Sequence, residues 1–150
     1  MDILEFQGDS RWLSNFWPCV VWLDGDCYAS VEHAYQAAKT LLGLERQKIR
    51  LIKQPGQAKR FAKSVTMRPG WESIKVSIMR ELLLQKFKKP EFRAKLLATS
   101  GTIIEGNYWH DTFWGVCNCP KHHGEGSNTS GSLILEIREE LKCQDLKSGN

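Results

Sequence analysis

A short stretch at residues 30–40 places four reactive types of side chain at helical spacing. Glu32, Tyr35, Gln36 and Lys39 supply a carboxylate, a phenol, an amide and an amine. Because an α-helix turns about 100° per residue, positions three, four and seven residues apart lie on one face. A carboxylate can transfer a proton and a neutral amine can attack carbon, so this stripe could carry out chemistry. The stripe either faces bulk water or lines a pocket.

Three further segments, residues 11–19, 66–73 and 105–115, combine aromatic rings with polar side chains, and they contain five of the six tryptophans. Flat rings can stack on a heteroaromatic base, and sites concentrate on loops. Ordinary core packing is the alternative. The pattern supports a purine or pyrimidine pocket, and the side chains of interest in these segments are Asn15, Phe16, Trp71, Asp111 and Trp114.

The positive charge of the chain is concentrated in one span. The formal net charge is +4, but residues 46–95 contain fifteen Lys or Arg and three acids, a net +12. Such a span is typical of a surface that binds a phosphorylated nucleotide or a nucleic acid. The alternative is a set of separately solvated helix faces.

Five cysteines at irregular spacing argue against a secreted disulfide framework. Cys117, Cys119, His122 and His123 suggest zinc, but all four lie within seven residues and lack a second, separated pair. We therefore expect no metal and no cofactor.

The N-terminus lacks the basic and apolar regions of a signal peptide, and no apolar run is long enough to span a bilayer. The sequence therefore predicts a cytoplasmic protein with no membrane partner.

The 150 residues suit one ordinary domain. Asp24-Gly25 predicts the turn of a hairpin over 19–30. Ser30 is the expected N-cap of a helix over 31–42, which we expect Gly43 to end. These elements predict an α+β fold, a helix-rich single domain over 1–143 with a small antiparallel sheet and a flexible tail over 144–150. The other expected elements are strands over 3–6 and 102–109 and helices over 44–54, 56–64, 70–89, 90–100 and 131–141.

Five motifs occur in a fixed order along the chain: "FWPC", "VEHAYQAAK", "RPGW", "IIEGNYWHDTFWG" and "GEGSNTSGSLILEIR". Together they resemble the NADAR (NAD and ADP-ribose) superfamily of YbiA-like N-glycosidases, from about residue 5 to residue 140. The resemblance implies a compact α+β fold and an enzyme that cleaves an N-glycosidic bond to a ribose.

Similar proteins act on two kinds of substrate. One kind is a phosphorylated ribosylamino-pyrimidine intermediate of riboflavin synthesis, and the other is ADP-ribosylated guanine in nucleic acid. Both partners are anionic, which suits the basic span. A non-catalytic module that binds ADP-ribose or nucleotides, and a nucleic-acid-binding module, are the alternatives.

With this resemblance, the helical stripe is expected to form the floor of the pocket. Glu32 would stabilise the developing positive charge at C1′ or activate water. Lys39 would attack C1′ as a neutral amine or would neutralise phosphate, and Asp111 would protonate the base or hold the ribose hydroxyls. The expected substrate-binding residues are Asn15, Phe16, Tyr35, Gln36, Arg68, Trp71, Trp114, Gly115 and Asn128.

Overall fold

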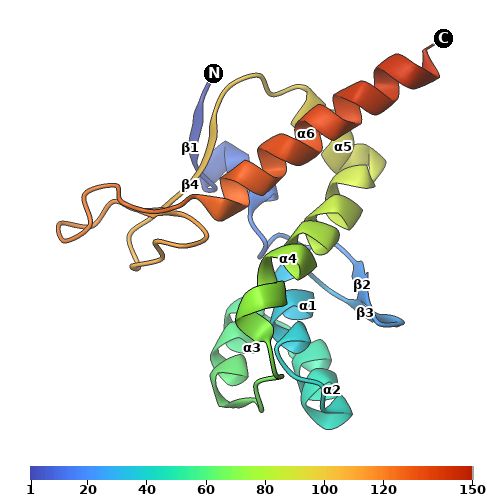
Figure 1. Ribbon diagram of the computed structural model, residues 1–150, viewed down its shortest axis with the longest axis vertical. Coiled ribbons are helices and arrows are strands. Elements are labelled where there is room, and N and C mark those ends of the chain that lie inside the picture. The colour runs from blue at the N-terminus through green and yellow to red at the C-terminus, as the bar shows by residue number, and fades with distance from the viewer. Residues whose placement is uncertain (150) are drawn as a thin grey trace. The chain divides into compact units, whose positions relative to one another are not determined.

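A computed structural model describes residues Met1–Gly149, which form two compact units (Figure 1). One unit spans Asn15–Lys86, and the other combines Met1–Ser14 with the chain from Phe87 onward. Within the described residues, no helix has the length and apolar character needed to cross a membrane.

The unit over Asn15–Lys86 contains a hairpin and a group of helices. As predicted, β2 and β3 pair antiparallel, and Asp24 and Gly25 between them have φ of 49° and 90°, the left-handed values of a type I′ turn. The elements are β2 (Val21–Leu23), β3 (Asp26–Tyr28), α1 (Val31–Ala38), α2 (Gly43–Leu51), α3 (Pro55–Phe61), a 3₁₀ turn (Ala62–Ser64) and α4 (Trp71–Lys88), whose last turn crosses the unit boundary.

Helix α1 lies at the centre of this unit. The Ser30 hydroxyl accepts a hydrogen bond from the His33 backbone N–H at 3.1 Å, which confirms the predicted N-cap. Helices α2 and α3 and both hairpin strands contact α1, and all eight of its residues are buried. Three of them are alanines, and their small side chains let neighbouring elements approach the helix closely.

Helix α1 is shorter than its sequence pattern predicts. It ends at Ala38 rather than Leu42, and Gly43 begins α2 instead of ending α1. The chain turns because the Thr40 hydroxyl accepts the Leu42 backbone N–H at 3.1 Å, a local bond that competes with the helix.

The second unit is built on a three-stranded sheet in the order β1–β4–β5, with both pairings parallel. The α+β class is confirmed, and the small antiparallel sheet that was expected is the pair β2–β3, whereas the parallel pairing of β1, β4 and β5 was not predicted. Alternation along a strand does not encode its direction, and β1 pairs with a segment about 100 residues further along the chain. The elements are β1 (Ile3–Glu5), a 3₁₀ helix (Gly8–Leu13), α5 (Pro90–Leu97), β4 (Ile103–Asn107), β5 (Val116–Cys117) and α6 (Thr129–Ser148).

Helix α6 lies beside β4 (Figure 1), and it ends at Ser148 rather than at the predicted residue 141. Residues 144–148, expected as part of a flexible tail, are helical, and Asn150 lies outside the described residues. The Arg93 guanidinium donates to the Leu141 carbonyl at 3.5 Å and pairs with Asp145, so α5 stabilises this extension.

Candidate active site

The polar stripe of α1 does not face bulk water. Glu32 is 6% exposed, Tyr35 is 5% exposed and Gln36 is 2% exposed, while Lys39 is half-buried. A buried carboxylate and a buried amide are costly unless hydrogen bonds or charges compensate them. The interpretation of the stripe as a solvated helix face is therefore wrong.

Glu32 and Gln36 form a hydrogen-bonded pair one turn apart. The Gln36 amide nitrogen donates to Oε1 of Glu32 at 2.7 Å, and the Glu32 backbone N–H donates to the Asn15 carbonyl at 3.0 Å. The amide oxygen of Gln36 is buried and has no hydrogen-bond partner among the described residues. It is an acceptor suited to a hydroxyl or N–H of a ligand.

Lys39 follows the pair at the C-terminal end of α1, beside two aromatic rings. Its ammonium nitrogen lies 5.5 Å from the centre of the Tyr35 ring. The Trp71 ring, at the start of α4, lies 5.3 Å from Tyr35 at an interplanar angle of 52°. The two buried rings give Lys39 an apolar wall on one side.

The pKa of Lys39 lies below its ordinary value, chiefly because burial disfavours the charged amine. The Glu32 carboxylate opposes this shift of the pKa, and the ammonium groups of Lys59 and Lys75 reinforce it. The result is an amine that gives up its proton more easily than a surface lysine does. Such an amine can act as a nucleophile.

Arg68 is held against the C-terminal end of α1. Its backbone N–H donates to the Lys39 carbonyl at 2.7 Å, and its guanidinium donates to the Ala38 carbonyl at 3.3 Å. The Arg68 Nε is buried and has no hydrogen-bond partner among the described residues. It is a donor suited to an anionic ligand group.

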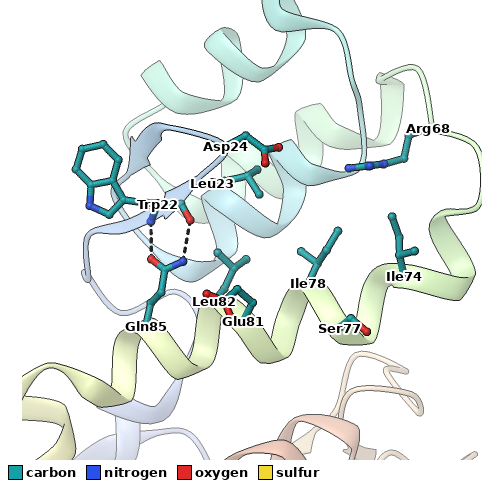
Figure 2. A pocket seen from close by; sticks show the side chains of 10 residues that line it. All are labelled: Trp22, Leu23, Asp24, Arg68, Ile74, Ser77, Ile78, Glu81, Leu82 and Gln85. Atoms are coloured by element: carbon teal, nitrogen blue, oxygen red, sulfur yellow. Dashed lines mark hydrogen bonds between the residues drawn. The ribbon is translucent and has the colours of Figure 1, made fainter.

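A cavity of about 500 Å³ opens between the hairpin and α4 (Figure 2). Ile74, Ile78 and Leu82 of α4 form one wall, and Gln85 bonds the backbone of Trp22 through both amide atoms, at 2.8 and 2.9 Å. Of the predicted substrate-binding residues, only Arg68 lines this cavity.

The two remaining candidates in this unit precede the hairpin. The Asn15 amide contacts the Met79 sulfur at 3.6 Å, and Phe16 is 42% exposed. The unit therefore contains eight of the twelve predicted site residues. Asp111, Trp114, Gly115 and Asn128 belong to the other unit.

Asp111 closes a tight turn in that second unit. Its Oδ1 accepts the backbone N–H groups of Phe113 at 3.1 Å and of Trp114 at 2.9 Å. Asn107, which is buried, accepts the Asp111 backbone N–H at 3.2 Å and donates to the Asp111 carbonyl at 2.8 Å. Asp111 therefore has a structural role in addition to its predicted catalytic one.

Gly115 and Asn128 have packing roles that account for their residue types. A Cβ atom at Gly115 would lie 2.1 Å from the Glu105 carbonyl oxygen. The Asn128 side chain accepts the Glu105 backbone N–H at 2.9 Å and donates to the Ile103 carbonyl at 3.0 Å, which ties the start of α6 to β4. Substrate binding by these two residues stays a prediction.

Sequence reasoning missed Asn107, whose side chain organises the turn after β4, because an Asn at the end of a strand is a common residue. The set of metal-binding side chains that the sequence suggests, Cys117, Cys119, His122 and His123, also differs from the set in the structure. The structure brings His110, rather than His123, to Cys117, Cys119 and His122. The missed signal is a histidine seven residues before Cys117.

An Asp111→Asn variant separates the two roles of this residue. The asparagine oxygen can still accept both backbone N–H groups, so we expect little change in melting temperature, whereas an Asp111→Ala variant should lose ~1 kcal/mol of stability. Turnover of Asp111→Asn should fall by ~10²-fold, since only the charge and the acid are lost. Thermal melting and kcat of both variants check this, and an unchanged kcat in Asp111→Asn would leave only the structural role.

The chain matches known proteins over most of its length. The NADAR domain model matches residues 5–142. The chain is 38% identical to N-glycosidase YbiA of Escherichia coli over 136 residues, covering 87% of this chain and 81% of that protein. It is 33% identical to N-glycosidase Npun_R5314 of Nostoc punctiforme, covering 86% and 84%.

Two further matches extend the comparison. The riboflavin biosynthesis protein VVA0006 of Vibrio vulnificus is 32% identical over 133 residues, covering 87% of this chain and 35% of that protein. The NMR structure of E. coli YbiA aligns with a TM-score of 0.80 and 33% identity, covering 97% of this chain and 86% of that one. Sequence, family model and fold agree, and the chain belongs to the NADAR family.

Proposed function

We propose that this N-glycosidase hydrolyses the bond between ribose and a base or amine in a phosphorylated ribosylamino-pyrimidine, an intermediate of riboflavin synthesis. The general activity, hydrolysis of an N-glycosyl bond, follows from its family and from relatives named N-glycosidase and riboflavin biosynthesis protein. The substrate is the part that we infer for this chain.

The observation that carries the proposal is the set of buried and half-buried polar side chains on α1 and at its C-terminal end. A carboxylate, an amide oxygen with no partner among the described residues, and an amine of lowered pKa lie within two turns of one helix. Cleavage at C1′ of a ribose requires a negative group beside the developing positive charge and a nucleophile for the carbon. Glu32 and Lys39 supply these two functions.

Charges around Lys39 support an anionic substrate. Lys59 and Lys75 act electrostatically on Lys39, Lys75 also pairs with Glu72 at 2.5 Å, and Arg68 is held at the same end of α1. The positive charges of Lys39, Lys59 and Arg68 would attract a phosphate group to this end of the helix. We therefore place the substrate phosphate at the C-terminal end of α1.

In the proposed reaction, the Lys39 amine forms a bond to C1′ as the bond from C1′ to the base nitrogen breaks. The electron pair leaves with the base, which a general acid protonates. The Lys39 nitrogen then loses a proton, the bond from C1′ to the ring oxygen breaks, and the ring oxygen takes up a proton, which leaves C1′ as an iminium with Lys39. Water adds to C1′, the bond from C1′ to Lys39 breaks, and the sugar leaves as an aldehyde while the amine is regenerated. Glu32 stabilises the positive charge at C1′ during the first step and activates water in the last.

A product assay tests the substrate. The protein is offered phosphorylated ribosylamino-pyrimidine, NAD, ADP-ribose and ADP-ribosylated guanosine in parallel, and released bases and sugars are identified by mass spectrometry. We expect release from the first compound and at least ~10²-fold slower release from the others. Release from ADP-ribosylated guanosine alone would instead assign the chain to repair of modified nucleic acid.

The pH dependence of kcat tests the state of the amine. A neutral Lys39 is required for attack, so kcat should rise with pH through the lowered pKa of Lys39. Lys59 is exposed, and its positive charge helps to lower that pKa, so a Lys59→Gln variant should shift the rise to higher pH. A rise that stays at the same pH in Lys59→Gln would show that a different group controls kcat.

A further inference from the structure

Four side chains of the second unit point their metal-binding atoms toward one another. His110 lies in the loop after β4, Cys117 is in β5, and Cys119 and His122 follow in the next turn. One ligand atom from each residue lies within 4.8 Å of all the others.

The distances within this cluster are those of a metal site. The Cys119 sulfur lies 3.1 Å from Nδ1 of His122 and 3.4 Å from Nδ1 of His110, and the two Nδ1 atoms are 3.4 Å apart. In a tetrahedral zinc site, bonds of ~2.3 Å to sulfur and ~2.0 Å to nitrogen place neighbouring ligand atoms ~3.3–3.8 Å apart. These three atoms need shifts of only a few tenths of an ångström to meet that geometry, and the Cys117 sulfur lies within 4.8 Å of each of them.

A network of hydrogen bonds explains these three contacts less well than a bound metal ion does. The Cys119 sulfur and the two Nδ1 atoms form a triangle with three short sides. A near-linear hydrogen bond places its proton along one side only, so one proton cannot account for two of the short contacts. A cation at the centre satisfies all the ligand atoms together. Two thiols and two imidazoles are the ligands that structural zinc prefers.

The backbone holds both sides of the cluster in place. The Cys117 N–H donates to the Glu125 carbonyl at 2.9 Å, and the His122 N–H donates to the Cys119 carbonyl at 3.2 Å. On the other side, His110 has a φ of 71°, a left-handed conformation that is costly outside glycine. Such strain persists where the surrounding structure imposes it, and it often marks a functional site.

We propose that Cys117, Cys119, His110 and His122 bind one Zn²⁺ ion, through two thiolates and two Nδ1 atoms. The two thiols lose their protons to solvent when the ion binds. Four protein ligands fill a tetrahedral site, so the ion is structural and takes no part in the hydrolysis. Its role is to fix the loop that follows His110, which contains Asp111 and Trp114. This proposal replaces the expectation from sequence that the chain binds no metal.

Metal analysis of the purified protein tests the proposal. Protein expressed in zinc-supplemented medium is analysed for zinc by plasma mass spectrometry, and we expect about one ion per chain. Cys119→Ser and His110→Asn should each lose most of the zinc. Asparagine tolerates the left-handed conformation, so the His110 variant should keep its fold by circular dichroism.

Matched controls come from the same chain. Cys143→Ser removes an exposed cysteine, and His123→Asn removes the exposed histidine beside His122. Both should retain the zinc of the wild type, and chelation should lower the melting temperature of these proteins but not of His110→Asn.

Cobalt binding provides a readout that does not depend on any variant. Metal-free wild-type protein titrated with Co²⁺ under reducing conditions should develop the intense visible bands of tetrahedral cobalt with thiolate ligands. Wild-type protein that contains no zinc and shows no such bands overturns the proposal. Zinc that is retained in full by both Cys119→Ser and His110→Asn also overturns it.

Discussion

Replacement of Lys39 by arginine is expected to lower the rate of base release by ~10³-fold or more. A guanidinium stays protonated and cannot attack C1′, although it keeps the positive charge and can still lie over the Tyr35 ring. Single-turnover release of base, followed by mass spectrometry, measures the effect. The melting temperature should stay close to that of the wild type, because Lys39 is only half-buried.

Lys59→Arg is the matched control for this variant. Lys59 is exposed, acts on Lys39 only through its charge, and keeps that charge as arginine, so the control should retain most of its activity. Borohydride added during turnover should trap a ribosyl adduct on Lys39 in the wild type and in Lys59→Arg. An active Lys39→Arg protein together with no trapped adduct would exclude the covalent route and leave hydrolysis to Glu32 and water.

A Glu32→Gln variant is expected to bind substrate but to release base ~10³-fold more slowly. The amide oxygen of the new glutamine can still accept the hydrogen bond that Gln36 donates at 2.7 Å, so the fold of α1 should be preserved. In the proposed mechanism, the variant loses the negative charge beside C1′ and the group that activates water. Substrate affinity by calorimetry and kcat by the product assay separate binding from chemistry.

Glu91→Gln provides the control for the loss of a carboxylate. Glu91 is exposed in the first turn of α5, so neutralising it should leave both affinity and kcat unchanged. If Glu32→Gln turned over at the rate of the control, the catalytic carboxylate would have to be sought elsewhere.

Local sequence signals predicted the elements that depend on local chemistry. Ser30 predicted the start of α1, and Asp24-Gly25 predicted the hairpin. Pro90 predicted α5, where it occupies the first turn. Each of these residues acts on backbone groups within a few positions of itself, so a short window of sequence contains the necessary information.

Features that depend on distant contacts were missed. The pairing of β1 with β4 joins segments about 100 residues apart, and its parallel direction has no local signature. The burial of α1 on all sides depends on α2, α3 and the hairpin together, and the pattern of one helix alone suggested a single apolar face.

The candidate site shows the same contrast between side chains on one helix, which the sequence can group, and side chains that only the fold brings together. Spacing on one helix correctly placed Glu32, Gln36 and Lys39 together. Spacing along the chain failed for the cysteine cluster, because His110 reaches it across a turn that Asn107 organises. At Asn128, the structure shows hydrogen bonds that tie α6 to β4, which the sequence did not predict, and its predicted contact with substrate stays a prediction.

The amide oxygen of Gln36 links ligand occupancy to the thermal behaviour of the protein. This oxygen is buried and has no hydrogen-bond partner among the described residues, and a buried acceptor that stays unsatisfied costs ~1–3 kcal/mol of stability. A bound ribose hydroxyl or base N–H would remove that cost in addition to making its own contact. Substrate should therefore protect this protein against heat more than an analogue that lacks the donor. The free energy of binding would then appear as added thermal stability of the protein with bound substrate.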